Sequence, residues 1–361
     1  MSRVRHLAPR HAVTLIELLI TITIIATLSA AFLGASRSAM EAANAARTKS
    51  TVNKIHGLLM EKWSSFSTRR ADINPLIIID IKRAFPNNPT YQGKALADAR
   101  LLATRELMKL EMPDRWSDVV LEVIPDTTVG TVNLNRTSIL AARPNLSRNY
   151  LQRFTQAVNV NNNGKTLKQN QGAECLYLTI MLATADGEAR SLFSPRDIGD
   201  TDEDGALEFL DGWGNPINYI RWPVGFVAYS DLMSGDADSD HDPFDPFRRD
   251  MPTAISPRVR DYPSSIKDFM DEIRDRNSQK NPVSAYRLLP LVYSGGPDGD
   301  PDLFLAKQTL IDDPYRVYES SGITAQIGTP MASNPSGINI DPDDDGDNWL
   351  DNIHSHLLDG R

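Results

Sequence analysis

Cysteine is almost absent from this chain, which has one, Cys175, among its 361 residues. A single thiol excludes an intramolecular disulfide framework and any zinc or iron–sulfur site that needs several cysteines. Histidine is scarce as well, since two of the six histidines lie in the first eleven residues. The sequence also lacks the G-x-S-x-G, H-E-x-x-H, P-loop and G-x-G-x-x-G patterns of common hydrolases and nucleotide-binding proteins. We therefore expect that the protein is not an enzyme.

Positive charge is in deficit. The 38 Lys and Arg residues stand against 47 Asp and Glu residues, which gives a formal net charge of −9. Such a chain lacks the basic face that general nucleic-acid binding needs, so we expect no nucleic-acid partner. The charge is also uneven, because residues 197–250 hold 14 acidic and 3 basic residues, whereas the first ten residues hold three arginines and no acid. The two parts of the chain therefore suit different surroundings.

An apolar run without proline occupies residues 13–35 and carries one charged residue, Glu17. About 20 apolar residues in a helix cross the hydrocarbon core of a bilayer, so the run predicts a transmembrane helix over residues 13–36. Arginines before the run and none within it favour a cytoplasmic N-terminus. A cleaved secretory signal peptide is the alternative, but this run is too long and continues into further helix.

The helix is expected to continue beyond the membrane. No proline occurs between Pro9 and Pro75, and apolar residues recur at helical spacing after the span. This stripe consists of Val52, Ile55, Leu59, Trp63 and Phe66. The pattern predicts an amphipathic continuation over residues 37–67 that packs its stripe on an external domain. The whole helix would be ~80 Å long at ~1.5 Å per residue.

Glu17 is an unusual residue in a membrane span. A carboxylate at the bilayer centre costs about 2.5–3.5 kcal/mol, and less near the interface, so a hydrated acid at the membrane surface is one interpretation. Its context is Arg10-His11-Ala12-Val13-Thr14-Leu15-Ile16-Glu17-Leu18. This segment resembles the processing site of type IV prepilins and type II secretion pseudopilins, in which a basic leader, a small residue and an apolar residue precede Thr-Leu-Ile-Glu-Leu. Alanine here replaces the usual glycine before the cut, and valine replaces the usual phenylalanine after it.

The resemblance implies how the chain is processed and assembled. A prepilin peptidase would remove residues 1–12 as a basic leader by cutting between Ala12 and Val13, and Val13 would be N-methylated. Glu17 would pair with the N-terminal amine of a neighbouring subunit, since opposite charges relieve each other's burial cost in low dielectric. Further implied partners are like or related pilin subunits, the inner-membrane assembly platform and membrane lipid. The head, residues 68–361, would lie in the periplasm, and the fibre in the periplasm or at the cell surface.

Alternating acids mark residues 200–211, DTDEDGALEFLD. D-x-D-x-D-G is the spacing of a calcium loop, in which alternate carboxylates converge and the glycine permits a sharp turn. The candidate ligands are Asp200, Asp202, Asp204, Glu208 and Asp211, with Leu207 as an inward apolar anchor. Hard oxygen ligands suit calcium better than zinc. Gly212, Gly214 and Pro216 exclude the exit helix of an EF-hand, and an acidic solvated loop without an ion is the alternative.

Two further segments resemble parts of the major pseudopilins. Residues 211–219, DGWGNPINY, resemble their D-x-W-G-N-P-x-x-Y segment, which predicts Trp213 in the core, a turn, and a strand over 217–222. An apolar strand over 288–294 then precedes GGPDGDPD, which resembles their calcium loop. That resemblance implies Ser294, Asp298 and Asp302 as ligands, and a plain Gly-Pro turn is the alternative.

A third acidic run lies near the C-terminus. It repeats the D-x-D-x-D-G spacing and supplies the candidate ligands Asp341, Asp343, Asp345 and Asp347. The neighbouring His354 and His356 are expected to be a solvated pair. Residues 230–286, which typical pseudopilins lack, are expected to be a solvated insertion.

The remaining pattern predicts helices over residues 91–112, 146–158 and 173–185 and a strand over 119–124. Cys175 is expected to be a buried, inert thiol. Together these elements predict an α+β fold, with the long N-terminal helix packed on a small antiparallel sheet and with extra helices, acidic loops and an acidic C-terminal tail.

Three functions are compatible with this sequence. The first is a structural pseudopilin polymerised into a type II secretion or type IV pilus-like fibre, with a head stabilised by calcium. The second is an adhesin-like pilin, and the third is a membrane-tethered periplasmic enzyme. The processing motif with Glu17 favours the first two, because a simple tether has no use for an acid there. The two pseudopilin-like segments favour the first.

Overall fold

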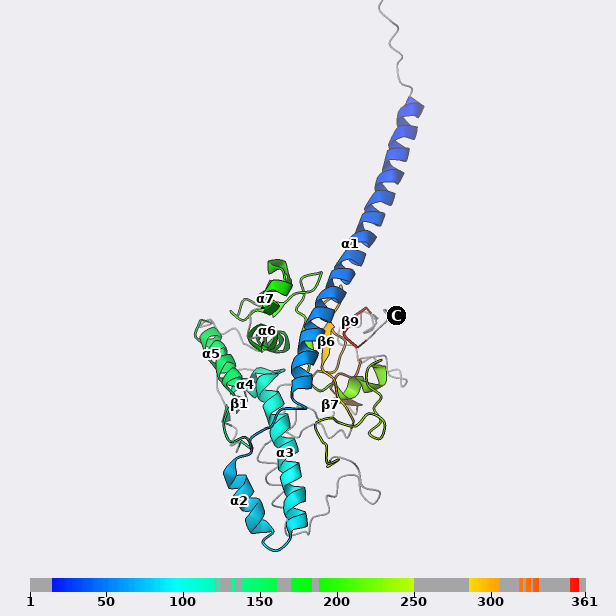
Figure 1. Ribbon diagram of the computed structural model, residues 1–361. Coiled ribbons are helices and arrows are strands. Elements are labelled where there is room, and N and C mark those ends of the chain that lie inside the picture. The colour runs from blue at the N-terminus through cyan, green and yellow to red at the C-terminus, as the bar shows by residue number, and fades with distance from the viewer. Residues whose placement is uncertain are drawn as a thin grey trace, which may run out of the picture.

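A single helix of 51 residues, α1 (Leu15–Ser65), gives the computed structural model its shape (Figure 1). Its first half projects from the head, and its apolar side chains are exposed there, as Leu15 and Phe32 illustrate at 82% and 73% exposure. The hydroxyls of Thr21, Thr23 and Thr27 donate to carbonyls three or four residues earlier, so they are satisfied within the helix. By its length and composition, α1 can cross a membrane.

The second half of α1 lies in the core of the head, as predicted. The five stripe residues, Val52, Ile55, Leu59, Trp63 and Phe66, are at most 7% exposed. This half of α1 contacts α6 (Gln171–Ala183) on one side and the strands β6 (Leu291–Ser294) and β9 (Ile353–His354) on the other. One continuous helix is therefore both an exposed apolar arm and a central element of the head.

The structure describes residues 15–120, 122–123, 132–133, 138–160, 170–183, 188–249, 286–305, 318–320, 323–325, 327–330 and 351–356. The other helices are α2 (Pro75–Ala84), α3 (Pro89–Glu111), α4 (Trp116–Val120), α5 (Asn145–Val160), α7 (Glu188–Leu192) and the 3₁₀ turns η1 (Pro195–Asp197) and η2 (Val224–Tyr229). The paired short strands are β1 (Glu122–Val123) with β2 (Val132–Asn133), β3 (Ile198–Gly199) with β4 (Glu208–Phe209), and β7 (Tyr318–Ser320) with β8 (Ile323–Ala325). The predicted α+β class is confirmed in this form: a long apolar N-terminal helix, a small antiparallel sheet and extra helices.

The sheet that receives α1 has three antiparallel strands in the order β5-β6-β9, where β5 is Asn218–Ile220. Tyr219 pairs with Val292, and Tyr293 pairs with His354, so a segment near the C-terminus completes the sheet. The predicted strands over 217–222 and 288–294 are confirmed as β5 and β6, each shorter than the pattern suggested. All four residues of β6 are buried, because α1 packs on this central strand.

The helices predicted over 91–112, 146–158 and 173–185 are present as α3, α5 and α6, with ends that differ by one or two residues, although 184–185 lie outside the described residues. The predicted strand over 119–124 is wrong at its start, since residues up to Val120 belong to α4 and β1 spans two residues. Helix α2 was not predicted. It begins at Asn74-Pro75, where the Asn74 side chain accepts from the Leu76 N–H and proline takes the first turn, so a cap signal was present.

A buried ion network joins α3 and α4 to β5. Arg221 is fully buried and pairs with Asp118 at 2.8 Å and Asp114 at 3.3 Å, and it donates to the Met112 carbonyl. Burial alone would raise the pKa of the Asp114 carboxyl, but the charges of Arg115 and Arg221 outweigh that effect and hold the pKa below its usual range. This network fixes the end of α3 against the strand that follows the acidic loop.

The two C-terminal histidines are not a solvated pair, because His354 and His356 are both at least 95% buried. His356 donates from Nε2 to the Pro290 carbonyl at 2.9 Å, which leaves Nδ1 to accept from the Ser230 hydroxyl at 3.2 Å. Burial is the main cause that lowers the pKa of His356 to about 3, helped by the neighbouring His56 and His354 and opposed by the Pro290 hydrogen bond. His356 is therefore neutral in the folded protein.

This burial predicts an acid-dependent loss of stability. Above the ordinary histidine pKa of 6.5 the ring is neutral in both states, whereas below it the unfolded chain binds a proton that the folded chain does not. The free energy of unfolding should fall by up to about 1.4 kcal/mol per pH unit from this residue as the pH drops below that value. Urea unfolding of the wild type and His356→Gln between pH 7 and 5 checks the prediction. Equal pH slopes in the two proteins would contradict it.

Candidate metal centre and the docking of helix α1

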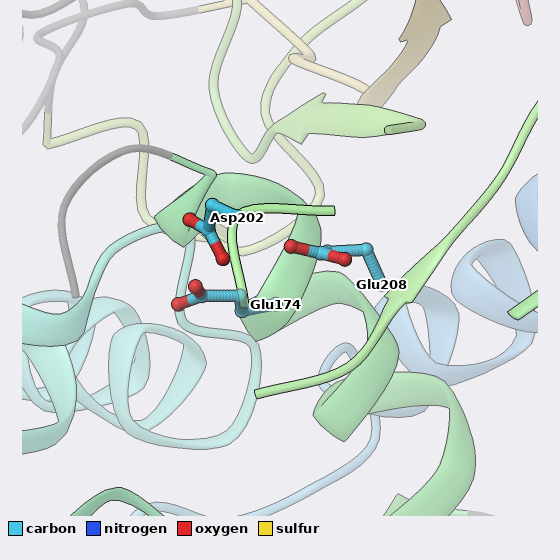
Figure 2. Close-up of side chains that lie close together, drawn as sticks. All are labelled: Glu174, Asp202 and Glu208. Atoms are coloured by element: carbon cyan, nitrogen blue, oxygen red, sulfur yellow. The ribbon is translucent and has the colours of Figure 1, made fainter. Parts of the chain in front are cut away.

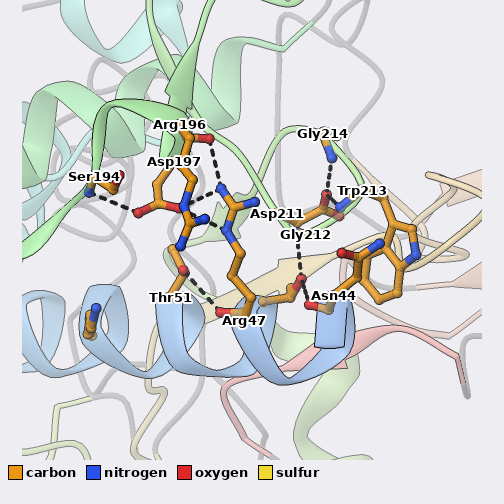
Figure 3. Close-up of polar contacts among 12 residues, drawn as sticks. Asn44, Arg47, Thr51, Ser194, Arg196, Asp197, Asp211, Gly212, Trp213 and Gly214 are labelled. Atoms are coloured by element: carbon orange, nitrogen blue, oxygen red, sulfur yellow. Dashed lines mark hydrogen bonds and ion pairs between the residues drawn. The ribbon is translucent and has the colours of Figure 1, made fainter. Parts of the chain in front are cut away.

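A polar contact anchors α1 beside its apolar stripe (Figure 3). Arg47 donates from Nε and Nη2 to Asp197 Oδ1 at 3.0 and 2.6 Å, and from Nη2 to the Arg196 carbonyl at 2.8 Å. The other Asp197 oxygen accepts from the Ser194 N–H at 2.9 Å. Although burial would raise the pKa of Asp197, the Arg47 guanidinium and the Ser194 N–H lower it. Asp197, just before β3, is thus held as a carboxylate that fixes α1 to the head.

Asp211 organises the turn that follows β4. Its Oδ1 accepts from the N–H groups of Trp213, Gly214 and Asn215 at 2.8 to 2.9 Å, and its Oδ2 accepts from the Ser294 hydroxyl at 2.7 Å. Asp211 and Ser294, both predicted metal ligands, therefore lie outside the carboxylate groups described below and bind each other. Trp213 was predicted in the core, but its side chain is only half-buried.

Gly212 brings this turn directly against α1. Its N–H donates to Thr48 Oγ1 at 2.7 Å, and a Cβ at this position would lie 2.4 Å from the Asn44 carbonyl oxygen. Such close approach of two backbones needs a glycine. The turn capped by Asp211 thus holds the middle of α1, through Gly212.

Hydrogen bonds from backbone N–H groups to carboxylates of the same loop hold the acidic loop between β3 and β4 in a tight turn. Asp200 accepts from the N–H groups of Asp204 and Gly205 at 3.0 Å each, and Asp204 accepts from the Ala206 N–H at 2.8 Å. Gly205 has φ +92°, as the sharp turn requires. The loop brings single carboxylate oxygens of Asp200, Asp202 and Asp204 within 4.8 Å of one another. The convergence expected from the D-x-D-x-D-G spacing is therefore present, but Leu207 points outward at 41% exposure.

A second group of carboxylates includes a residue that sequence reasoning missed. Glu174, near the start of α6, meets Asp202 and Glu208, with one oxygen from each within 4.8 Å of the others (Figure 2). Glu174 is 1% exposed, and its Oε2 accepts from the Trp116 indole N–H. Its signal in the sequence is weak: a single acid in the apolar helix GAECLYLTIML, 26 residues before the loop begins.

Burial and mutual repulsion dominate the electrostatics of this group. Burial, followed by the charge of Asp204, raises the pKa of Glu174 to about 10. Burial also raises the pKa of Glu208 to about 7, although Glu208 accepts from the Thr201 N–H at 3.0 Å. Burial and the charges of Asp204 and Asp200 raise the pKa of Asp202. Either a proton or a cation relieves such crowding.

The third group lies in the loop after β6. One oxygen each from Asp298, Asp302 and Asp351 lie within 4.8 Å of one another. Asp351 was not predicted, because it comes from the segment before β9 and only the sheet brings it here. Gly296 has φ +68°, and a Cβ there would lie 2.8 Å from the Asp351 carbonyl oxygen, so the loop is seated closely on that segment.

These donor sets fit a hard divalent cation. All the oxygens come from carboxylates, and within each group they lie no more than 4.8 Å apart, close enough for one ion to contact all three. In the second and third groups such an ion would draw together segments that are distant in the sequence. The predicted residues Ala12, Val13, Asp341, Asp343, Asp345 and Asp347 lie outside the described residues. Glu17 lies in the first turns of α1, on the exposed arm.

Comparison of this chain with models of protein families, with curated proteins and with solved structures finds no match.

Two glycine substitutions test the docking of α1. Gly212→Ala should lower the free energy of unfolding by about 1–3 kcal/mol, because the new methyl group overpacks the contact with Asn44. Gly57→Ala, on the exposed face of the docked half of the same helix, meets no atom within 4 Å and should raise the free energy of unfolding by about 0.5–1 kcal/mol. Denaturant unfolding of both variants measures the difference. If both substitutions changed the free energy of unfolding in the same direction, the close contact between Gly212 and Asn44 would be contradicted.

Proposed function

We propose that this protein is a structural pilin-like subunit of the pseudopilin type, stored in a membrane by the first half of α1 and polymerised through it. One observation carries the proposal: an apolar arm with an acid near its start is continuous with a helix buried in the head. The exposed residues of the arm need lipid or other apolar helices around them. A fibre core made of such arms supplies those helices once the subunit leaves the bilayer.

The way α1 docks on the head favours a fibre subunit over a membrane-tethered protein. A tether needs an apolar segment and a flexible linker, whereas here the helix runs without a break from Leu15 to Ser65. The stripe from Val52 to Phe66, the Arg47–Asp197 pair and the Gly212 contact all fix it to the head. A load applied to the arm therefore reaches the head directly, as a fibre subunit requires.

Glu17 has a role in this proposal that a tether does not offer. A prepilin peptidase removes residues 1–12 and leaves Val13 as a methylated N-terminus, whose amine pairs with Glu17 of an adjacent subunit. The subunit resides in the inner membrane with its head in the periplasm, where an assembly platform extracts it into a periplasmic or surface fibre. The acidic loops around residues 200–208 and 298–302 bind calcium and stabilise the head outside the cytoplasm.

Substitution of Glu17 tests this assembly. Glu17→Gln should insert and fold normally but reduce incorporation into fibres at least about tenfold, since loss of one partner of a buried ion pair costs about 3–5 kcal/mol. Crosslinking of subunits in cells that express the secretion or pilus machinery measures incorporation. Glu41→Gln, the same change at an exposed position near the middle of α1, is the matched control and should assemble like the wild type. Normal assembly of Glu17→Gln would contradict the proposal.

A further inference from the structure

The strongest unexplained feature of the head is the buried carboxylate of Glu174. Its side chain comes from α6 and points towards Asp202 of the acidic loop and Glu208 of β4 (Figure 2). One of its oxygens, Oε2, accepts from the Trp116 indole, whereas no N–H or O–H donor reaches the buried Oε1, and the neighbouring Asp204 carboxylate can hydrogen-bond to Glu174 only through a shared proton. A carboxylate oxygen in that position is costly unless something positive lies against it.

We infer that Glu174, Asp202 and Glu208 are the carboxylate ligands of one divalent cation of the calcium class. Glu174 supplies the observation that an acidic loop alone lacks, because it comes from another element, is 1% exposed and has a buried oxygen that no protein donor reaches. One oxygen from each residue lies within 4.8 Å of the other two, which suits an ion with oxygen ligands at about 2.3–2.6 Å.

The ligand set differs from the one that the loop spacing suggests. Asp200 uses both oxygens to cap the N–H groups of the loop, and Asp211 caps the following turn. They shape the site, and Glu174 takes the position of a ligand contributed from another element. Asp202 belongs both to this group and to the group of Asp200 and Asp204, so the ion also offsets the charge of the loop.

The surroundings of Glu174 allow an ion to arrive. A cavity of about 340 Å³ is lined by Glu174 together with Gly205 and Ala206 of the loop, so the Glu174 side of the group borders open space. Glu208 is held by the Thr201 N–H at 3.0 Å and by Asn170 at 3.4 Å, which orient its carboxylate towards the site. A bound ion would link α6 to the β3–β4 hairpin, and α6 in turn packs on α1.

This inference names the ligands of the proposed calcium site in the acidic loop and does not depend on fibre assembly. If the inference is wrong, this site binds no cation, and the proposed role of α1 in assembly is unaffected. Conversely, normal assembly of Glu17→Gln would contradict the fibre proposal but would not affect the inferred cation site.

The test uses the full-length protein in detergent, with Ca²⁺, Mg²⁺ and Tb³⁺ as the probes. Calcium should raise the melting temperature of the wild type above its value in EDTA. Tb³⁺ should show luminescence sensitised by Trp116, whose indole contacts Glu174, and Ca²⁺ should displace it more effectively than Mg²⁺. Trp116→Phe should lose most of that sensitised emission, which localises the ion even if other loops also bind cations.

Glu174→Gln is the decisive variant. It should weaken calcium binding at this site at least about tenfold, while its stability in EDTA equals or exceeds that of the wild type, because without a cation this buried carboxylate must bind a proton or remain an unpaired charge, and glutamine needs neither. Glu203→Gln is the matched control, since it removes the same charge from an exposed position of the same loop, and it should bind calcium within about twofold of the wild type. Wild-type binding by Glu174→Gln, or a wild type that calcium does not stabilise, would overturn the inference. If calcium does not stabilise the wild type and Glu174→Gln is more stable than the wild type, the result would instead indicate that Glu174 shares a proton with a neighbouring carboxylate.

Discussion

The contact between the second half of α1 and the head is the constraint on which the rest of the structure depends. An apolar stripe buries itself between α6 and the strands β6 and β9, and two polar contacts, Arg47 with Asp197 and Gly212 with Thr48, fix its position. Helix α1 therefore cannot leave the head without opening its core. The exposed apolar arm is consequently held in a fixed relation to the head, and this rigidity is what distinguishes a fibre subunit from a tethered domain.

The acidic loops are organised around the same contact. The β3–β4 hairpin carries one loop and Asp197, the turn capped by Asp211 follows it, and Asp211 reaches Ser294 at the end of β6. Each carboxylate group also recruits a residue from elsewhere: Glu174 from α6 in one case, and Asp351 from the segment before β9 in the other. Cations at these places would join elements that already pack on α1, so cation binding and helix docking would reinforce each other.

Features with a strong local signal could be predicted from the sequence. The stripe from Val52 to Phe66 follows a 3.6-residue period, and the strands β5 and β6 follow apolar alternation or an apolar run between turns. Long-range contacts could not be predicted in this way. Glu174 resembles any single acid in an apolar helix until the fold places it against Asp202, and Asp351 meets Asp298 only because β9 pairs with β6.

The errors have the same origin. His354 and His356 were expected in solvent because they lie near the chain end, but pairing of β9 with β6 buries them under η2. Trp213 was expected in the core by resemblance, but it lies in the turn that meets α1 and is only half-buried. Local pattern identifies which segments form elements, whereas the tertiary pairing decides which polar groups are buried.

The mass of the N-terminus of the protein, purified from its own membranes, tests the central claim most directly. The account predicts a mature chain that begins at Val13 and carries one N-methyl group, despite the alanine that precedes the cut. A chain that retains the leader from Met1 would contradict it, since the amine that pairs with Glu17 would then not exist.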